Sequence, residues 1–137
     1  MAQPGEILHY ANYVFEDGSK GDKLFVVLNV ADINVPCLIL KTTSQSKRYE
    51  GVGKGCNPKK NVFFVPRDWE RCFELDTYIQ LPQIIEISTE ELLKGALSKN
   101  IRILNSLSTE CFKQFKNCLK QFKEDVSPYH WNLIFKS

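Results

Sequence analysis

The chain has 137 residues, of which 43% are hydrophobic and 12% aromatic, and its formal net charge is +2 at pH 7. This size and apolar content suit one soluble domain, residues 1–137, with a substantial hydrophobic core. No stretch approaches the roughly 20 apolar residues of a membrane span, and the first residues lack the basic and apolar regions of a signal peptide. We therefore expect a cytoplasmic protein with no membrane partner.

Strand patterns dominate the first two thirds of the chain. Short runs rich in β-branched and aromatic residues, separated by turn clusters, predict strands at 6–15, 24–30, 37–42, 62–65, 77–81 and 84–88. The segment 48–60 contains three glycines, a proline and four bases, and we expect a mobile loop there. Sequential short strands with irregular loops predict a small antiparallel barrel over about 5–88, or two curled sheets.

Helical patterns appear only after residue 88. Ser88 and Glu91 have capping-box spacing and open a short helix that Gly95 can end. A clearer helix is predicted at 108–123, where apolar residues recur with helical spacing and lysines take the other side. The helical part thus spans about 89–124. The apolar tail, 125–137, is expected to add a last strand or to meet a partner.

Five cysteines and two histidines indicate neither a disulfide framework nor a zinc site. The cysteine number is odd and no two are spaced as CxxC. We expect most of them to be small apolar core residues in a reducing compartment, and we predict neither a metal nor a cofactor. The cysteines are Cys37, Cys56, Cys72, Cys111 and Cys118.

Charge is distributed in blocks. Residues 41–71 carry eight bases and three acids, whereas 72–91 carry five acids and no base. A solvated loop is one interpretation of the basic block. The other is a phosphate-binding surface with aromatic platforms, as in proteins that bind single-stranded nucleic acid. The block contains Tyr49, Trp69, Lys41, Lys47, Arg48, Lys54, Lys59, Lys60, Arg67 and Arg71.

Four short segments stand in an informative order. Gly5-Glu6-Ile7 opens the first strand, and Asp17-Gly18-Ser19 precedes GDKLFVVLN at 21–29. The apolar strand from residue 37 ends in Thr42, Thr43 and Ser44, and LDTYIQLPQIIEIS at 75–88 leads into a helix. Together, over roughly residues 5–122, these segments resemble the MazF/PemK-type toxins. Each motif is short, and their conjunction carries the resemblance.

The resemblance implies a fold and an activity. It implies a mainly β protein, a small SH3-like antiparallel barrel with peripheral helices, including a C-terminal one, that forms a homodimer and is neutralised by a small acidic antitoxin. It also implies a metal-independent endoribonuclease that cleaves single-stranded RNA to 2′,3′-cyclic phosphate and 5′-hydroxyl ends. Thr43, flanked by Ser44, takes the family's threonine position, and Lys23 the position of its usual arginine. The expected RNA-binding residues are Lys41, Gln45, Lys47, Arg48, Tyr49, Lys54, Lys59 and Lys60.

Departures from the family pattern leave alternatives open. Lys23 keeps the charge of the family's arginine but not its bidentate fork, and Gln80 and Pro82 stand where some members have Arg and Asp. Arg48 can assist Lys23, and His9 is a possible base or a satisfied strand residue. Thr43 can equally have only a structural role, because threonine hydroxyls commonly form hydrogen bonds within turns at strand ends. An inactive barrel that binds nucleic acid or protein, or an interaction module using the apolar tail, are the competing hypotheses.

Overall fold

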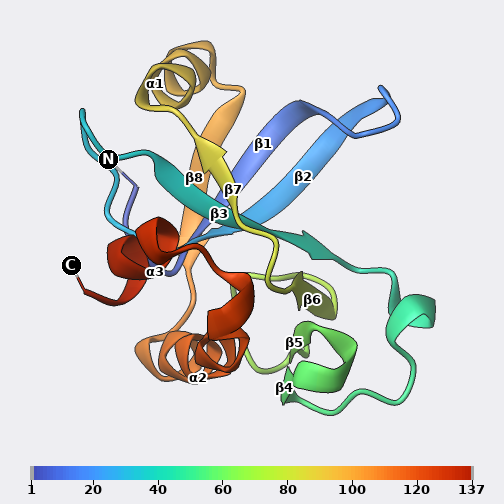
Figure 1. The fold of residues 1–137 in the computed structure, drawn as a ribbon. Helices are drawn as coiled ribbons and strands as arrows, with labels where there is room; N and C mark the ends of the chain where they lie inside the picture. The colour runs from blue at the N-terminus through green and yellow to red at the C-terminus, as the bar shows by residue number, and fades with distance from the viewer. Residues whose placement is uncertain (1, 137) are drawn as a thin grey trace.

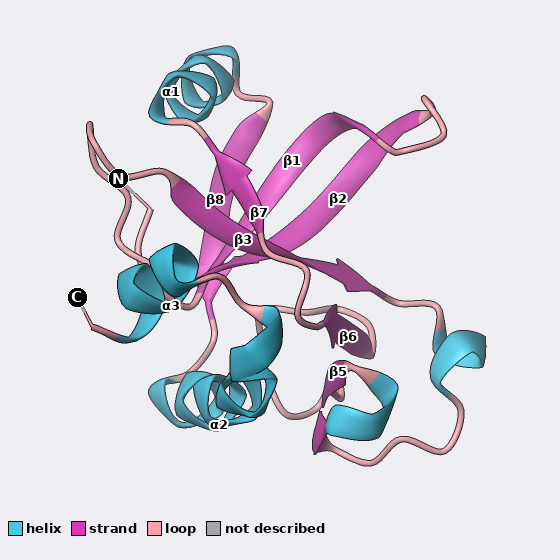
Figure 2. Cartoon of the chain, viewed as in Figure 1, coloured by secondary structure: helices cyan, strands magenta, loops and turns pink. Residues whose placement is uncertain are grey.

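The computed structural model describes residues 2–136 and is built mainly of antiparallel sheet with three helices (Figures 1 and 2). The helices are α1 (Thr89–Ser98), α2 (Thr109–Leu119) and α3 (Pro128–Phe135), and short 3-10 turns occupy η1 (Ser46–Tyr49), η2 (Pro58–Lys60) and η3 (Lys120–Asp125). The strands are β1 (Glu6–Val14), β2 (Lys20–Val27), β3 (Cys37–Thr43), β4 (Gly55–Asn57), β5 (Val62–Val65), β6 (Thr77–Gln80), β7 (Ile85–Ile87) and β8 (Ile101–Ser106).

The strand β3 is the centre of the sheet. The strand order is β4-β5-β6-β3-β2-β1-β8, and β7 pairs with β3 off this path. The start of β3 pairs with β7 and its end pairs with β6, so that Cys37 lies opposite Ile87 and Thr42 opposite Ile79. Within residues 2–136, the outermost strands β4 and β8 do not pair with each other, and the sheet is open. The predicted antiparallel architecture is confirmed, whereas the pairings do not close a barrel.

The two faces of the sheet bury two different cores. Alternate residues of a strand point to opposite faces. Accordingly, Val26 and Leu40 join a larger cluster with Phe115 of α2, while Phe25 joins a smaller cluster with Leu92 of α1. The helix α2 follows the predicted amphipathic pattern, and its N-cap Ser108 accepts a hydrogen bond from the backbone N–H of Cys111. The expectation that this helix packs one face on the sheet is confirmed.

Four parts of the secondary structure differ from expectation. The tail forms the helix α3 instead of a strand, because Ser127 caps it and Pro128 occupies the first turn. Gly95 lies inside α1, which continues to Ser98. The strand β8 was not expected, since five of its six residues are exposed and show no alternation. The expected loop at 48–60 contains β4 and the turn η2.

One cysteine pair corrects the expectation that the cysteines form no disulfides. Cys56 of β4 and Cys118 of α2 form a disulfide across a sequence separation of 62. Cys37, Cys72 and Cys111 are buried free thiols, as predicted for most cysteines. Among residues 2–136, no helix combines the length and the apolar content that crossing a membrane requires.

Candidate functional site

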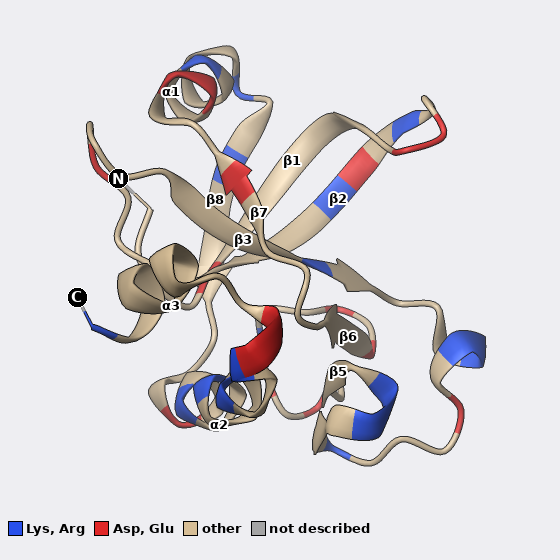
Figure 3. Cartoon of the chain, in the orientation of Figure 1, with Lys and Arg blue, Asp and Glu red and all other residues tan. Residues whose placement is uncertain are grey.

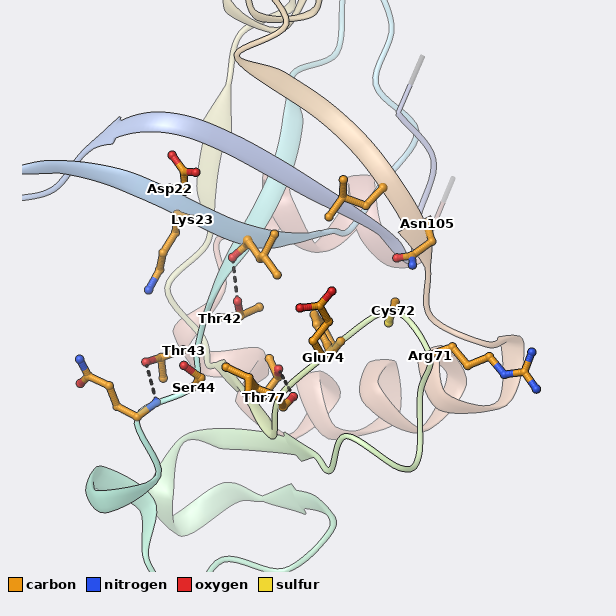
Figure 4. Close-up of a pocket in the computed structure, with 15 residues that line it drawn as sticks. Asp22, Lys23, Thr42, Thr43, Ser44, Arg71, Cys72, Glu74, Thr77 and Asn105 are labelled. Carbon is orange, nitrogen blue, oxygen red and sulfur yellow. Dashed lines mark hydrogen bonds between the residues drawn. The ribbon is translucent and has the colours of Figure 1, made fainter.

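An open pocket of about 610 Å³ lies between β2, the end of β3, the segment 71–77 and β8 (Figure 4). The three residues predicted to be catalytic, Lys23, Thr43 and Ser44, all line it. They arrive from two neighbouring strands, because the end of β3 lies next to β2 in the sheet. The pocket also contains Asp22, Leu24, Thr42, Gln45, Arg71, Cys72, Phe73, Glu74, Leu75, Thr77, Leu104 and Asn105. We call it the catalytic pocket, after the role predicted from the sequence for Lys23, Thr43 and Ser44.

The hydroxyl row at the end of β3 divides into structural and available groups. Thr42 is buried, and its Oγ1 donates a hydrogen bond to the backbone carbonyl of Leu24 at 2.8 Å. Thr43 is half-buried, and its Oγ1 accepts from the backbone N–H of Gln45 at 3.2 Å, which shapes the turn. Ser44 is exposed in the pocket. A buried strand therefore ends in hydroxyls where its backbone leaves the core and enters a pocket.

Lys23 brings a partly buried cation to the same pocket. Burial, followed by the charges of Lys41 and Arg48, lowers the pKa of Lys23 below its ordinary 10.5. Its Nζ lies 5.9 Å from the centre of the Phe15 ring. In Figure 4 its side chain extends from β2 toward the turn that follows Thr43. In the described part of the chain no carboxylate forms a salt bridge with Lys23, so its charge is available to an incoming anion.

A second pocket, of about 590 Å³, is strongly cationic. It gathers four of the predicted RNA-binding residues that carry positive charge: Lys41, Arg48, Lys59 and Lys60. Figure 3 shows in blue the basic residues of the turns η1 and η2, of which Arg48, Lys59 and Lys60 line this pocket. We call it the cationic pocket; it also contains Glu16, Tyr49, Asn61, Gln80, Leu81 and Gln83. The charges of Lys41 and Arg48 also lower the pKa of Lys23, so these two cations of the cationic pocket lie near the catalytic pocket.

The predicted aromatic platforms are occupied by other protein groups. Tyr49 is 9% exposed and stacks on Tyr78 with ring centres 5.0 Å apart. Its hydroxyl accepts a hydrogen bond from Nε2 of Gln80 at 3.1 Å. Trp69 packs against Phe63, and the Nζ of Lys54 lies 4.3 Å from its ring centre. Tyr49 and the contact of Lys54 with Trp69 thus hold residues 49–54 against the sheet.

The remaining predicted residues lie at different distances from the two pockets. Gln45 lines the catalytic pocket, whereas Lys47 is exposed and lines neither pocket. His9 of β1 does not line the catalytic pocket but places its Nε2 3.3 Å from Oδ2 of Asp22, which does. Its Nδ1 is buried without a hydrogen-bond partner. His9 therefore reaches the pocket only through Asp22.

Sequence reasoning missed one wall of the catalytic pocket. Arg71 and Glu74 come from the linker before β6, and Leu104 and Asn105 from the unexpected strand β8. In Figure 4 the Glu74 side chain points into the middle of the pocket, while Arg71 points away from it. Glu74 belongs to the acidic block at 72–91, but nothing in the sequence brings that block to the end of β3. The pairing of β3 with β6 does so.

Two comparisons, with protein-family models and with curated proteins, return no match. No protein-family model matches the chain, and no curated protein is similar to it. Across residues 2–136, no group of three or more His, Cys, Asp or Glu side chains is arranged to hold a metal ion.

Proposed function

We propose that this protein is a toxin-like, metal-independent endoribonuclease of the MazF/PemK type that cleaves single-stranded RNA in the cytoplasm. One observation supports the proposal above all others. Lys23, Thr43 and Ser44, which the resemblance selected from separate parts of the sequence, line one pocket, and that pocket adjoins a surface of four cations. A phosphodiester chain has the charge and shape that such a surface stabilises.

In the proposed reaction, RNA supplies its own nucleophile. The ribose 2′-hydroxyl loses its proton, its oxygen attacks the adjacent phosphorus, and the 5′-oxygen leaves and takes up a proton. The products are a 2′,3′-cyclic phosphate and a 5′-hydroxyl. The protonated Lys23 stabilises the additional negative charge of the phosphorane, and the Thr43 and Ser44 hydroxyls hold the phosphate oxygens. Arg48, close enough to lower the pKa of Lys23, adds a second positive charge at the entrance.

The cationic pocket would bind the RNA backbone on one side of the scissile phosphate. This pocket offers positive charge but no exposed aromatic ring on which a base could stack, because Tyr49 is buried. The charges are those of Lys41, Arg48, Lys59 and Lys60. Binding there is thus expected to be insensitive to base identity. A small acidic antitoxin would neutralise the protein by covering the same cations, since its carboxylates compete with phosphates for them.

The finer architecture and the assembly are part of the same proposal. We assign the curved sheet to the SH3-like barrel class of this family and the functional unit to a homodimer. Two copies of the exposed edge of β8, related by a two-fold axis, would pair antiparallel and satisfy each other's free backbone groups. The exposed Ile103 and Leu104 of β8, with Leu93 and Leu97 of α1, would add apolar contact. Light scattering should give twice the chain mass, and Ile103→Lys should reduce it to one chain.

The alternative is a catalytically inactive barrel that binds nucleic acid or protein through the same surface. Gln80 favours this alternative, because it stands where some family members have arginine. Its side-chain N–H also already donates a hydrogen bond to the hydroxyl of Tyr49. Neither Gln80 nor Pro82 can transfer a proton. The apolar-tail hypothesis receives less support, since Ile134 of α3 is 4% exposed within the larger core.

The test uses purified protein and a long unstructured RNA, with fragments analysed for cyclic phosphate ends. Lys23→Ala should reduce the cleavage rate by roughly 100- to 1000-fold, as removal of one charge-stabilising donor does. Lys23→Arg should keep or raise activity, because a bidentate fork replaces a point charge. Lys94→Ala is the matched control, since Lys94 is exposed on α1 and pairs only with Glu90 among the described residues. EDTA should not inhibit.

Three outcomes separate the hypotheses. Cleavage that depends on Lys23 but not on Lys94 supports the proposal. Intact RNA with both wild type and Lys23→Arg, together with salt-dependent RNA binding, supports the inactive barrel instead. Cleavage that survives Lys23→Ala keeps the enzyme but removes Lys23 from the mechanism, and Arg48 and His9 then become the residues to substitute.

A further inference from the structure

We propose that the disulfide between Cys56 and Cys118 is a reducible clamp that orders the basic segment, residues 44–60, and so regulates RNA binding by a thiol–disulfide exchange. The effect on RNA rests on the function proposed above. The effect on the segment itself does not, because it follows from how these residues are attached to the rest of the fold.

The clamp joins the outermost strand to the core. Cys56 lies in β4, which has three residues and pairs only with β5 at the end of the sheet path. Cys118 lies in α2 and is 1% exposed within the larger hydrophobic cluster. In Figure 1 the segment bearing β4 and the turns η1 and η2 forms the lower right of the molecule, and α2 lies beside β4. The disulfide thus anchors a peripheral segment to a rigid helix.

Apart from the β4–β5 pairing, a small number of contacts holds the basic segment. Tyr49 stacks on Tyr78, accepts a hydrogen bond from Gln80 and belongs to a small buried cluster that Val52 also contacts. Lys54 contacts the ring of Trp69. Several of its hydrogen bonds are local: Asn57 Nδ2 donates to the carbonyl of Gly53 at 2.7 Å, for example. Segments with few buried apolar contacts open at low free-energy cost. The covalent bond is therefore a large part of what restrains this one.

The segment carries the charges on which the cationic pocket depends. Arg48, Lys59 and Lys60 line that pocket, and Lys47 and Lys54 lie on the same segment. When the clamp is closed, these cations are held on the surface before RNA arrives. When the clamp is open, these side chains become ordered only when RNA binds. The conformational entropy lost on binding then lowers the affinity.

The geometry of the disulfide indicates how it is reduced. Cys56 is partly exposed, and Nε2 of Gln121 donates to its Sγ at 3.4 Å, whereas Cys118 is buried. A thiolate of a dithiol reductant attacks Cys56 Sγ, the S–S bond breaks, and Cys118 leaves as a thiolate that takes a proton. The second thiol of the reductant then attacks the mixed disulfide and releases Cys56 as a thiol. Two electrons and two protons pass to the protein, and the dithiol becomes a cyclic disulfide.

The other cysteines do not compete in this exchange. Cys37, Cys72 and Cys111 are buried free thiols. Burial raises the pKa of Cys37 and of Cys111 to about 12, and that of Cys72 to about 11. Thiols with so little thiolate at neutral pH attack disulfides slowly. The response of the chain to a dithiol should therefore come from one pair.

The experiment measures hydrogen–deuterium exchange of the full chain before and after dithiothreitol, with free thiols counted by mass spectrometry. Reduction should raise exchange in 44–60 and leave β1, β2 and α1 unchanged. The affinity for an unstructured fluorescent RNA should fall by roughly tenfold, equivalent to the cost of ordering one or two long side chains.

Two variants keep the test decisive. Cys56→Ser should show the reduced behaviour without reductant and should not respond to dithiothreitol. Cys56→Ser/Cys118→Ala repeats the test without a new free thiol in the core, and circular dichroism verifies that both fold. Unchanged exchange in 44–60 on reduction, or a response to dithiothreitol that persists in both variants, overturns the clamp. If hydrogen–deuterium exchange in 44–60 rises on reduction but neither redox state binds RNA, the clamp is supported and the RNA-binding function is rejected.

Discussion

Substitution of Gly95 by alanine tests how α1 is fitted onto the sheet. Gly95 lies within α1 and is buried against β8. A Cβ built on it would lie under 3.0 Å from Cδ1, Cγ1 and Cβ of Ile101, closer than real Cβ atoms approach. Ile101 is 4% exposed and β-branched, so its stem cannot rotate away without disturbing the smaller core. The strand that bears Ile101 also supplies Leu104 and Asn105 to the catalytic pocket.

Two opposing effects decide the magnitude. Alanine gains about 1 kcal/mol over glycine in a helix interior. Overpacking a close-packed contact costs about 1–3 kcal/mol, and the upper part of this range applies because a stem carbon is involved. We expect Gly95→Ala to lose about 1–2 kcal/mol of unfolding free energy. With an unfolding entropy of about 2.1 cal/mol/K per residue over 137 residues, Tm should fall by about 3–7 °C.

Urea unfolding followed by circular dichroism measures this loss. Gly53→Ala is the matched control: a Cβ there meets nothing within 4 Å, so the change should add about 0.4–1 kcal/mol through the unfolded chain. In an Ile101→Ala background, which removes Cγ1 and Cδ1, Gly95→Ala should cost at least about 1 kcal/mol less. A Gly95→Ala protein as stable as wild type, with no coupling to Ile101, would refute the packing argument.

Three further predictions concern charge and the tail. Because burial and neighbouring cations lower the pKa of Lys23, the turnover rate should decline on the alkaline side below pH 10.5, and Lys41→Gln should move that decline to higher pH. The unfolded chain then holds a proton that folded Lys23 has lost, so unfolding free energy should rise with pH between the folded-state pKa and 10.5. A log–log plot of the RNA association constant against salt concentration should have a slope of about −3 if four phosphates bind at the cationic pocket. Lys59→Gln/Lys60→Gln should reduce the magnitude of this slope by about 1.4. An unchanged slope would show that RNA binds elsewhere. Ile134→Ala should cost about 2–4 kcal/mol in urea unfolding, whereas the exposed Tyr129→Ala should change stability by less than about 0.5; equal effects would show that α3 is not part of the core.

The candidate site was predictable where it depends on neighbouring strands. The end of β3 and the middle of β2 lie side by side because consecutive antiparallel strands usually pair, and this brings Lys23 to Thr43 and Ser44. The basic residues Lys41, Arg48, Lys59 and Lys60 were identified from composition and are found in one pocket. Their roles in binding and catalysis stay predictions that the experiments above address.

Other features were not predictable because they depend on distant contacts. Tyr49 looks like an exposed platform in the sequence, yet the stack with Tyr78 buries it. Cys56 and Cys118 are 62 residues apart, and nothing local distinguishes them from the three free thiols. The tail is different: Ser127 followed by Pro128 is a helix-start signal that the sequence does contain, and the apolar content of 129–135 obscured it.

The sequence by itself determined the elements that are marked by a continuous apolar run or by a local cap. The apolar runs of β2 and β3 and the N-caps Ser88 and Ser108 are recognisable within a few residues of sequence. Only the tertiary structure decided the positions of β4 and β8, the disulfide, and the wall of the catalytic pocket that contains Glu74. A short or mostly exposed strand has no clear pattern of its own, because its stability comes from the backbone of a partner strand distant in sequence.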